Sequence, residues 1–224
     1  MRDFSMPLEL DHIFVCCDPG APEAETLIRL GLAEGPSNTH PGQGTANRRF
    51  PFGNSYLELL WITDPAEAQT GPARETRLWE RWTRRRSGAS PFGLVFRSRG
   101  APDGPAPFPT RAYRPAYLPP GLVMEFADGA PLEEPEIVFL PFVHGPGRVA
   151  PPMGGPVRGL IRAEAGLPRA DHLSDPSRAL AEAGLMAYRQ SPEHLLELVL
   201  DAGTAFAADL RPDLPLLLRG AAAR

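Results

Sequence analysis

Residues 8–62 contain four segments in close succession: LELDHIFVCC (8–17), PEAETLIRLGL (22–32), TANRRFPF (45–52) and YLELLWI (56–62). The first is rich in Ile, Phe and Val, as buried strands are. The second begins with Pro and carries early glutamates, which is typical of a helix N-terminus. Gly53-Asn54 joins the last two segments as a hairpin turn would. The chain therefore begins with strand, helix, strand and strand, with space for another short strand near residues 35–40.

The C-terminal part repeats this order. Residues 157–164 form a strand candidate, a short helix follows the N-cap signature Ser174-Asp175-Pro176, and two more strand candidates end near residue 201. Both copies close on Leu-Glu-Leu, at residues 57–59 and 196–198. The repetition indicates an internal duplication, and two such units side by side would form a curved sheet with a hollow face.

The region between the copies holds a predicted exposed helix at residues 72–86, which ends in Arg84-Arg85-Arg86, and a proline-rich β segment. A linker is predicted at residues 145–156. We therefore divide the chain into a first module (1–70), a connecting helix and middle β segment (71–150) and a C-terminal βαββ module (151–224), within one compact unit.

Composition excludes several classes of protein. All 23 basic residues among the 224 are arginine, so lysine Schiff-base chemistry and Walker-type phosphate binding are excluded. The net charge of −4 argues against nucleic-acid binding. We expect no membrane span, because no apolar run approaches about 20 residues, and no signal peptide. The adjacent Cys16 and Cys17 do not suit a structural disulfide, so a reduced, cytoplasmic protein is the simplest interpretation.

The run Leu10-Asp11-His12-Ile13, the block Gly42-Gln43-Gly44-Thr45-Ala46-Asn47 and the later Tyr56-Leu57-Glu58-Leu59 resemble the glyoxalase-like branch of the vicinal oxygen chelate superfamily. This superfamily includes glyoxalase I, extradiol dioxygenases and antibiotic-resistance proteins. The resemblance implies an α+β fold of paired βαβββ modules that form a curved mixed sheet, or cup. The proline-rich β segment would be an addition in the middle. The glycine-rich block leads into a strand, so we expect no nucleotide cofactor.

The resemblance also implies a divalent metal in the cup, such as Zn, Fe, Mn or Ni, bound by residues of the first and last strands of each module. In the first module those positions hold His12 and Glu58. His12 and Glu58 would stand on otherwise apolar faces, which is unfavourable unless they pair with each other or bind an ion. Both alternatives stay open.

The second module can be assigned in two ways. If it is the C-terminal copy, Glu197 is its last-strand ligand, and we expect His12, Glu58 and Glu197 to bind the metal. If it is the middle segment, the last-strand candidate is Glu136 and the first-strand position, near Gly93, holds no ligand. Of the other histidines considered, His144, His172 and His194, none stands at a ligand position.

The expected substrate-binding residues lie near the first-module ligands: Thr45, Asn47, Arg48, Arg49 and Tyr56. One of the two arginines would enter the cup and bind a carboxylate, while the other would be solvated. The glycine-rich loop forms either a rim of the pocket or a simple turn.

Three functions remain open. The first is a lyase, isomerase or dioxygenase acting on a small oxygen-rich metabolite, with Glu58 or Glu197 as catalytic base. The second is a metal-free cup that sequesters a small molecule, as resistance proteins of the superfamily do. The third is a partner-binding protein whose cup is filled by its own side chains. A homodimer is compatible with each of them.

Overall fold

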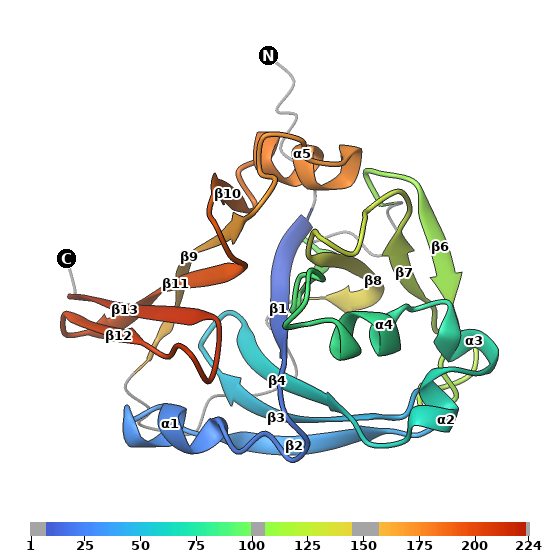
Figure 1. The fold of residues 1–224 in the computed structure, drawn as a ribbon, viewed down its shortest axis with the longest axis horizontal. Coiled ribbons are helices and arrows are strands. Elements are labelled where there is room, and N and C mark those ends of the chain that lie inside the picture. The colour runs from blue at the N-terminus through green and yellow to red at the C-terminus, as the bar shows by residue number, and fades with distance from the viewer. Residues whose placement is uncertain (1–7, 100–105, 145–156, 223–224) are drawn as a thin grey trace.

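The computed structural model describes residues 8–99, 106–144 and 157–222 (Figure 1). The predicted linker at 145–156 and the N-terminal residues considered for a signal peptide lie outside these ranges. Within the described residues, eight strands form a mixed sheet in the order β2-β3-β4-β1-β5-β8-β7-β6. They are β1 (Leu8–Cys16), β2 (Gly35–His40), β3 (Thr45–Pro51), β4 (Tyr56–Ile62), β5 (Phe92–Ser98), β6 (Thr110–Tyr113), β7 (Met124–Ala127) and β8 (Glu136–His144).

The eight-stranded sheet consists of two four-stranded halves that meet where β1 pairs antiparallel with β5. In each half the first strand pairs parallel with the last, β1 with β4 and β5 with β8. The α+β fold with curved mixed sheets is confirmed, as is the hairpin between β3 and β4. The topology also selects between the two assignments of the second half: the middle strands complete this sheet.

The C-terminal residues build a separate sheet in the order β10-β9-β11-β13-β12, visible on the left of Figure 1. Its elements are β9 (Gly159–Leu167), α5 (Asp175–Glu182), β10 (Ala187–Gln190), β11 (Leu195–Gly203), β12 (Phe206–Asp209) and β13 (Leu216–Ala222). Leu196, Leu198 and Leu218 join a core with Ile13 and Leu57 of the large sheet. The C-terminal copy therefore covers the outer face of the large sheet and does not form half of the cup.

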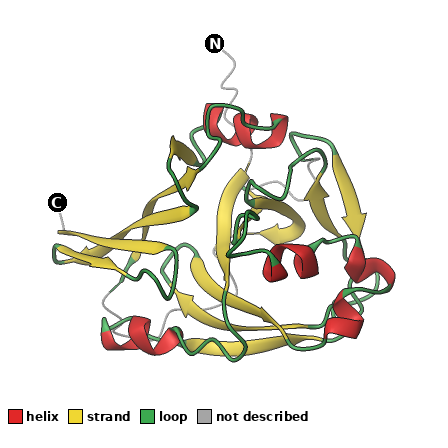
Figure 2. Ribbon diagram, viewed as in Figure 1, coloured by secondary structure: helices red, strands yellow, loops and turns green. Residues whose placement is uncertain are grey.

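Short helices flank the large sheet (Figure 2). They are α1 (Ala24–Arg29), α2 (Pro65–Ala68), α3 (Gly71–Arg74) and α4 (Leu78–Thr83). Helix α1 packs Ala24 and Leu27 into the core of the outer face, and α4 lies on the inner face. The single helix predicted over residues 72–86 is wrong in its continuity, because Arg77 takes a left-handed conformation (φ 58°) between α3 and α4. Leu78 and Trp82 of α4 then pack on the inner face against Phe14 and Val95. No helix in the described ranges is long and apolar enough to cross a membrane.

Candidate functional site

A β-bulge in β1 presents two consecutive polar side chains on the inner face of the large sheet. The register with β5 shifts between Leu10 and His12, so Asp11 is the extra residue. Bulges re-aim side chains that regular alternation would send to opposite faces. Asp11 and His12 therefore lie together, and the His12 Nδ1 is 2.7 Å from the Asp11 Oδ1.

The structure brings His12 and Glu58 together. The His12 Nε2 lies 3.2 Å from the Glu58 Oε2. The other carboxylate oxygen of Glu58 accepts a hydrogen bond of 2.8 Å from the Asn47 amide, and the Tyr56 ring stacks on the imidazole at 4.2 Å. These positions fix the imidazole between two carboxylates, those of Asp11 and Glu58.

The environment keeps this cluster ionised. Burial alone would lower the pKa of His12, but hydrogen bonds to Asp11 and Glu58 and their negative charges raise it to about 9. Burial opposes ionisation of Glu58 as well, yet the His12 hydrogen bond and charge bring the pKa of Glu58 below its usual value. The raised pKa favours the protonated imidazole at neutral pH, in which Nε2 donates to the Glu58 carboxylate.

Arg97 forms an ion pair with Asp11, the second carboxylate beside His12. Its Nη1 donates to the Asp11 Oδ2 at 2.7 Å, and its Nε donates to Glu9 at 2.7 Å. The charges of His12 and Arg97 lower the pKa of Asp11 although burial would raise it. Asp11 thus orients the imidazole through its contact with Nδ1, and Arg97 neutralises the Asp11 charge.

A polar rim borders the His12–Glu58 pair. Thr45 is buried, and its hydroxyl lies 2.8 Å from both the Gln43 Nε2 and the His40 Nδ1. Tyr117 packs its ring against His40 and donates to the Gln43 Oε1 at 3.1 Å. Burial lowers the pKa of His40. The negative charge of Glu58 opposes this shift, and the positive charge of His12 adds to it. The pKa of His40 therefore depends on the charges of the pair.

The two neighbouring arginines lie on opposite faces of β3. Arg49 pairs in register with Glu58, on the same face, and its Nε donates to the Pro36 carbonyl at 2.6 Å. Arg48 turns to the outer face and binds Glu34 and Glu25. Arg49 is therefore the arginine available to an anionic group near the pair.

Glu197 does not join this site. Leu196 and Leu198, its neighbours on β11, are buried in the core, so Glu197 points to the opposite face of the C-terminal sheet. There its Oε1 accepts from Arg219 at 2.9 Å and lies 3.7 Å from Arg162. The expected cluster of His12, Glu58 and Glu197 is wrong, because strand alternation sends Glu197 away from the large sheet.

The glycine-rich loop supports α2. The amides of Gly42 and Gly44 donate to the Glu67 carboxylate at 2.8 and 3.1 Å. A Cβ on Gly44 would lie 2.2 Å from the Asp64 carbonyl, and its φ is +70°. The close backbone approach at this loop is therefore to the chain itself.

The second half of the sheet carries a different arrangement in the same row. Glu58 pairs in register with Phe14, Phe14 with Gly93, and Gly93 with Glu136. A Cβ on Gly93 would lie 1.9 Å from the Phe14 ring, so this ring fills the first-strand position of the second half. Sequence reasoning identified the empty position but not its occupant.

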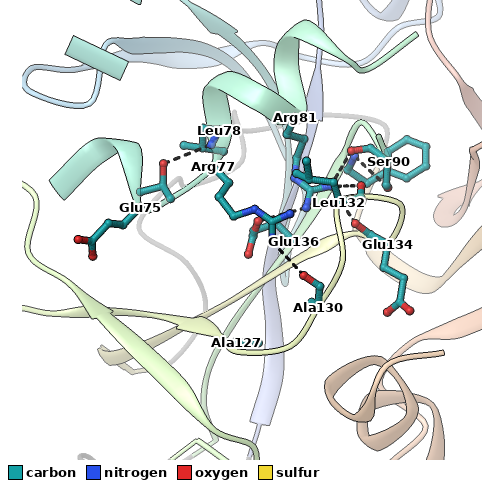
Figure 3. A network of polar contacts seen from close by, with 12 residues as sticks. Glu75, Arg77, Leu78, Arg81, Ser90, Ala127, Ala130, Leu132, Glu134 and Glu136 are labelled. Atoms are coloured by element: carbon teal, nitrogen blue, oxygen red, sulfur yellow. Dashed lines mark hydrogen bonds and ion pairs between the residues drawn. The ribbon is translucent and has the colours of Figure 1, made fainter. Parts of the chain in front are cut away.

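Glu136, the alternative last-strand candidate, is held by an arginine (Figure 3). The Arg81 Nη2 donates to its Oε2 at 3.1 Å, and the Arg111 Nη2 lies 3.6 Å from its Oε1. The Arg81 side chain is fully buried, although the sequence predicted an exposed helix here. A guanidinium therefore supplies the positive charge in this half.

The donor set decides how well a metal fits. Two ligands with bonds of about 2.0–2.2 Å to one ion have heads about 3 Å apart, so the 3.2 Å between His12 and Glu58 suits an ion as well as a hydrogen bond. A catalytic site normally has three protein ligands. Among the described side chains, no group of three or more His, Cys, Asp or Glu residues could hold an ion. The described donors therefore stop at two, His12 and Glu58.

The comparisons with known proteins agree with this fold. Residues 10–191 match the family model of the glyoxalase-like domain, and the chain belongs to this family of the vicinal oxygen chelate superfamily. A crystal structure of a hypothetical protein from Staphylococcus aureus is similar over 97% of this chain and 100% of that chain, with a TM-score of 0.52 and 9% sequence identity. That likeness concerns the fold alone. No curated protein matches the sequence.

Proposed function

We propose that this protein is a glyoxalase-like isomerase or lyase that moves protons on a small α-hydroxycarbonyl compound with the His12–Glu58 pair. The observation that supports this most is a buried imidazole nitrogen 3.2 Å from a buried carboxylate oxygen. A proton donor and a proton acceptor lie side by side, away from bulk water, where proton transfer is efficient.

The roles follow from the contacts. Glu58 takes the proton from the carbon next to the carbonyl, and His12 gives its Nε2 proton to the carbonyl oxygen, which produces an enediol. Glu58 then returns its proton to the former carbonyl carbon while the other hydroxyl returns one to His12, so the isomer forms and the ion pair is restored. Asp11 orients the imidazole, Asn47 orients Glu58, and Arg49 binds an anionic substituent.

Hydrogen–deuterium exchange tests this function without knowledge of the product. The purified protein is incubated in D2O with dihydroxyacetone, glycolaldehyde and hydroxyacetone, and loss of the α-proton is followed by NMR. We expect exchange with at least one compound, and a decrease of about 100-fold or more in Glu58→Gln, as loss of a general base causes. The matched control is Glu197→Gln, which should exchange like the wild type. Exchange that is equal in Glu58→Gln, or absent throughout, would contradict the proposal.

The same preparation tests for the divalent metal that the resemblance implies. Zn, Fe, Mn and Ni are quantified, and exchange is repeated after treatment with a chelator. We expect no change on chelation. Loss of exchange on chelation, with recovery on adding one of these ions, would show that the ion is needed.

A sequestering protein is the second candidate. It is favoured by the apolar inner face, on which Phe14, Tyr113 and Phe126 are buried. Binding of these compounds without exchange would support it over the enzyme.

A further inference from the structure

A cavity of about 500 Å³ lies at the carboxyl end of β1 and is not lined by His12 or Glu58. One side is formed by the large-sheet half of the molecule, with residues 16–17, Glu23, part of the loop between α4 and β5, and Glu133. The other side is formed by loops of the C-terminal sheet at residues 168–169, 192–194 and 212–215. The volume lies in the range of small-molecule sites, about 300–1,000 Å³.

Much of the wall is apolar and rigid. Cys16 and Cys17 line the cavity as buried thiols, and burial raises the pKa of Cys16 to about 12, so they stay neutral. Proline rings, whose backbones have little freedom, supply much of the remaining apolar surface. They belong to Pro91, Pro168, Pro192, Pro212 and Pro215.

Two buried acceptors at the wall lack partners among the described residues. Glu23 is 8% exposed; its Oε1 accepts from the Asp18 amide at 3.0 Å, but its Oε2 accepts from no group. The His194 Nε2 lies 3.3 Å from the Gly88 carbonyl, so this nitrogen carries the proton and the partnerless Nδ1 is an acceptor. Burial lowers the pKa of His194, which keeps the ring neutral. A ligand with hydrogen-bond donors would satisfy both the Glu23 Oε2 and the His194 Nδ1.

The balance of charge at the wall favours a cation. Arg85 and Arg86 both pair with Asp18, at 2.5 and 3.0 Å, and Glu193 pairs with Arg211. The lining residues that carry charge without an ion pair to another described residue are Glu23, Glu133, Asp213 and Arg169. Because Arg85 and Arg86 share one carboxylate, they leave one positive charge over, so three carboxylates stand against two positive charges and the wall has a net charge of −1.

The wall is also fixed in place before a ligand arrives. The Arg81 Nη1 donates to the carbonyls of Ser90, Leu132 and Glu134 at 2.7, 3.3 and 2.8 Å (Figure 3). These bonds join the segments that carry Pro91 and Glu133 into the cavity. A preformed wall reduces the entropy lost on binding.

We propose that this cavity is a second ligand site, which binds a small organic ammonium ion with an apolar body. The ammonium donates to the Glu23 Oε2, a further donor reaches the His194 Nδ1, and the apolar body packs between the prolines. The site is separate from the His12–Glu58 pair.

Benzylamine is the probe that tests the proposal, with benzyl alcohol and benzoate as neutral and anionic counterparts. Calorimetry measures affinity, and amide chemical shifts of the full chain locate binding. We expect benzylamine to bind more tightly than either counterpart and to shift the amides of Cys17 and His194 but not that of Asn47. Glu23→Gln should weaken binding about tenfold or more, as loss of a charged hydrogen bond does. The matched control is Glu25→Gln, an exposed position on α1, which should bind like the wild type.

Equal affinity in Glu23→Gln, preference for benzoate, absence of benzylamine binding, or shifts centred on Asn47 would overturn the proposal. If Glu23→Gln does not fold, His194→Leu replaces it, and an affinity equal to the wild type would be equally decisive against the site.

Discussion

Replacing Arg81 by Met should be among the most destabilising single substitutions in the molecule. Arg81 is fully buried, and its guanidinium contacts the Glu136 carboxylate and three backbone carbonyls (Figure 3). Met keeps the approximate length of the side chain but leaves Glu136, which is 2% exposed, without this partner. Breaking a buried ion pair in this way costs about 3–5 kcal/mol. Arg111, 3.6 Å from Glu136, compensates in part, so the lower end of that range is expected.

Urea unfolding followed by circular dichroism measures this loss. Because part of the cost arises from the uncompensated carboxylate, and the rest from three carbonyls that lose their donor, the double variant Arg81→Met/Glu136→Gln should recover more than about 1 kcal/mol over Arg81→Met alone. Arg84→Met, an exposed position one residue beyond α4, should stay within about 0.5 kcal/mol of the wild type. A loss below about 1 kcal/mol for Arg81→Met, or no recovery in the double variant, would refute the reasoning.

Three further predictions concern the inner face. Gly93→Ala should destabilise the fold by about 1–3 kcal/mol through overpacking against Phe14, and Phe14→Leu in the same chain should relieve part of the loss in urea unfolding. Arg49→Met should weaken binding of a carboxylate-bearing ligand in calorimetry, while Arg48→Met, on the outer face, should leave it unchanged. His12 should make stability depend on pH: its folded pKa of about 9 exceeds its unfolded value of 6.5, so its contribution is complete below pH 6.5 and is lost by pH 9. The unfolding free energy should fall by on the order of 3 kcal/mol over this window relative to His12→Gln, and parallel curves for the two proteins would contradict the pKa shift.

The first half of the fold could be predicted because its signals are local. The apolar run of β1, the Gly53-Asn54 turn and the alternation of β3 and β4 depend on neighbours in sequence. The same alternation placed Glu58 on one face with Tyr56, and the structure shows both beside His12. Local periodicity therefore suffices where consecutive strands pair.

The second half could not be predicted, because its pairing is long-range. The C-terminal copy repeats the sequence pattern of the N-terminal module. It nevertheless forms a separate sheet that packs against the outer face of the large sheet. Strand alternation places Glu197 and Leu198 on opposite faces of β11. It does not show that Leu198 packs against the large sheet, because that contact is long-range.

Three residues of the inner face also escaped prediction for particular reasons. Asp11 reaches it through a bulge that has no signature in the sequence. His40 lies on a polar edge strand, β2, that alternation does not identify. Arg81 is turned inward by the break at Arg77, where the sequence predicted one continuous exposed helix.

The pair of a protonated His12 and an ionised Glu58 is the central claim, and it is tested most directly by an NMR titration of the His12 imidazole in ¹³C-histidine-labelled protein, assigned with His12→Gln. We predict a midpoint of about 9 and an imidazolium at pH 7. A midpoint at or below 6.5, the ordinary value, would contradict the account, because His12 would then have no proton to give at neutral pH.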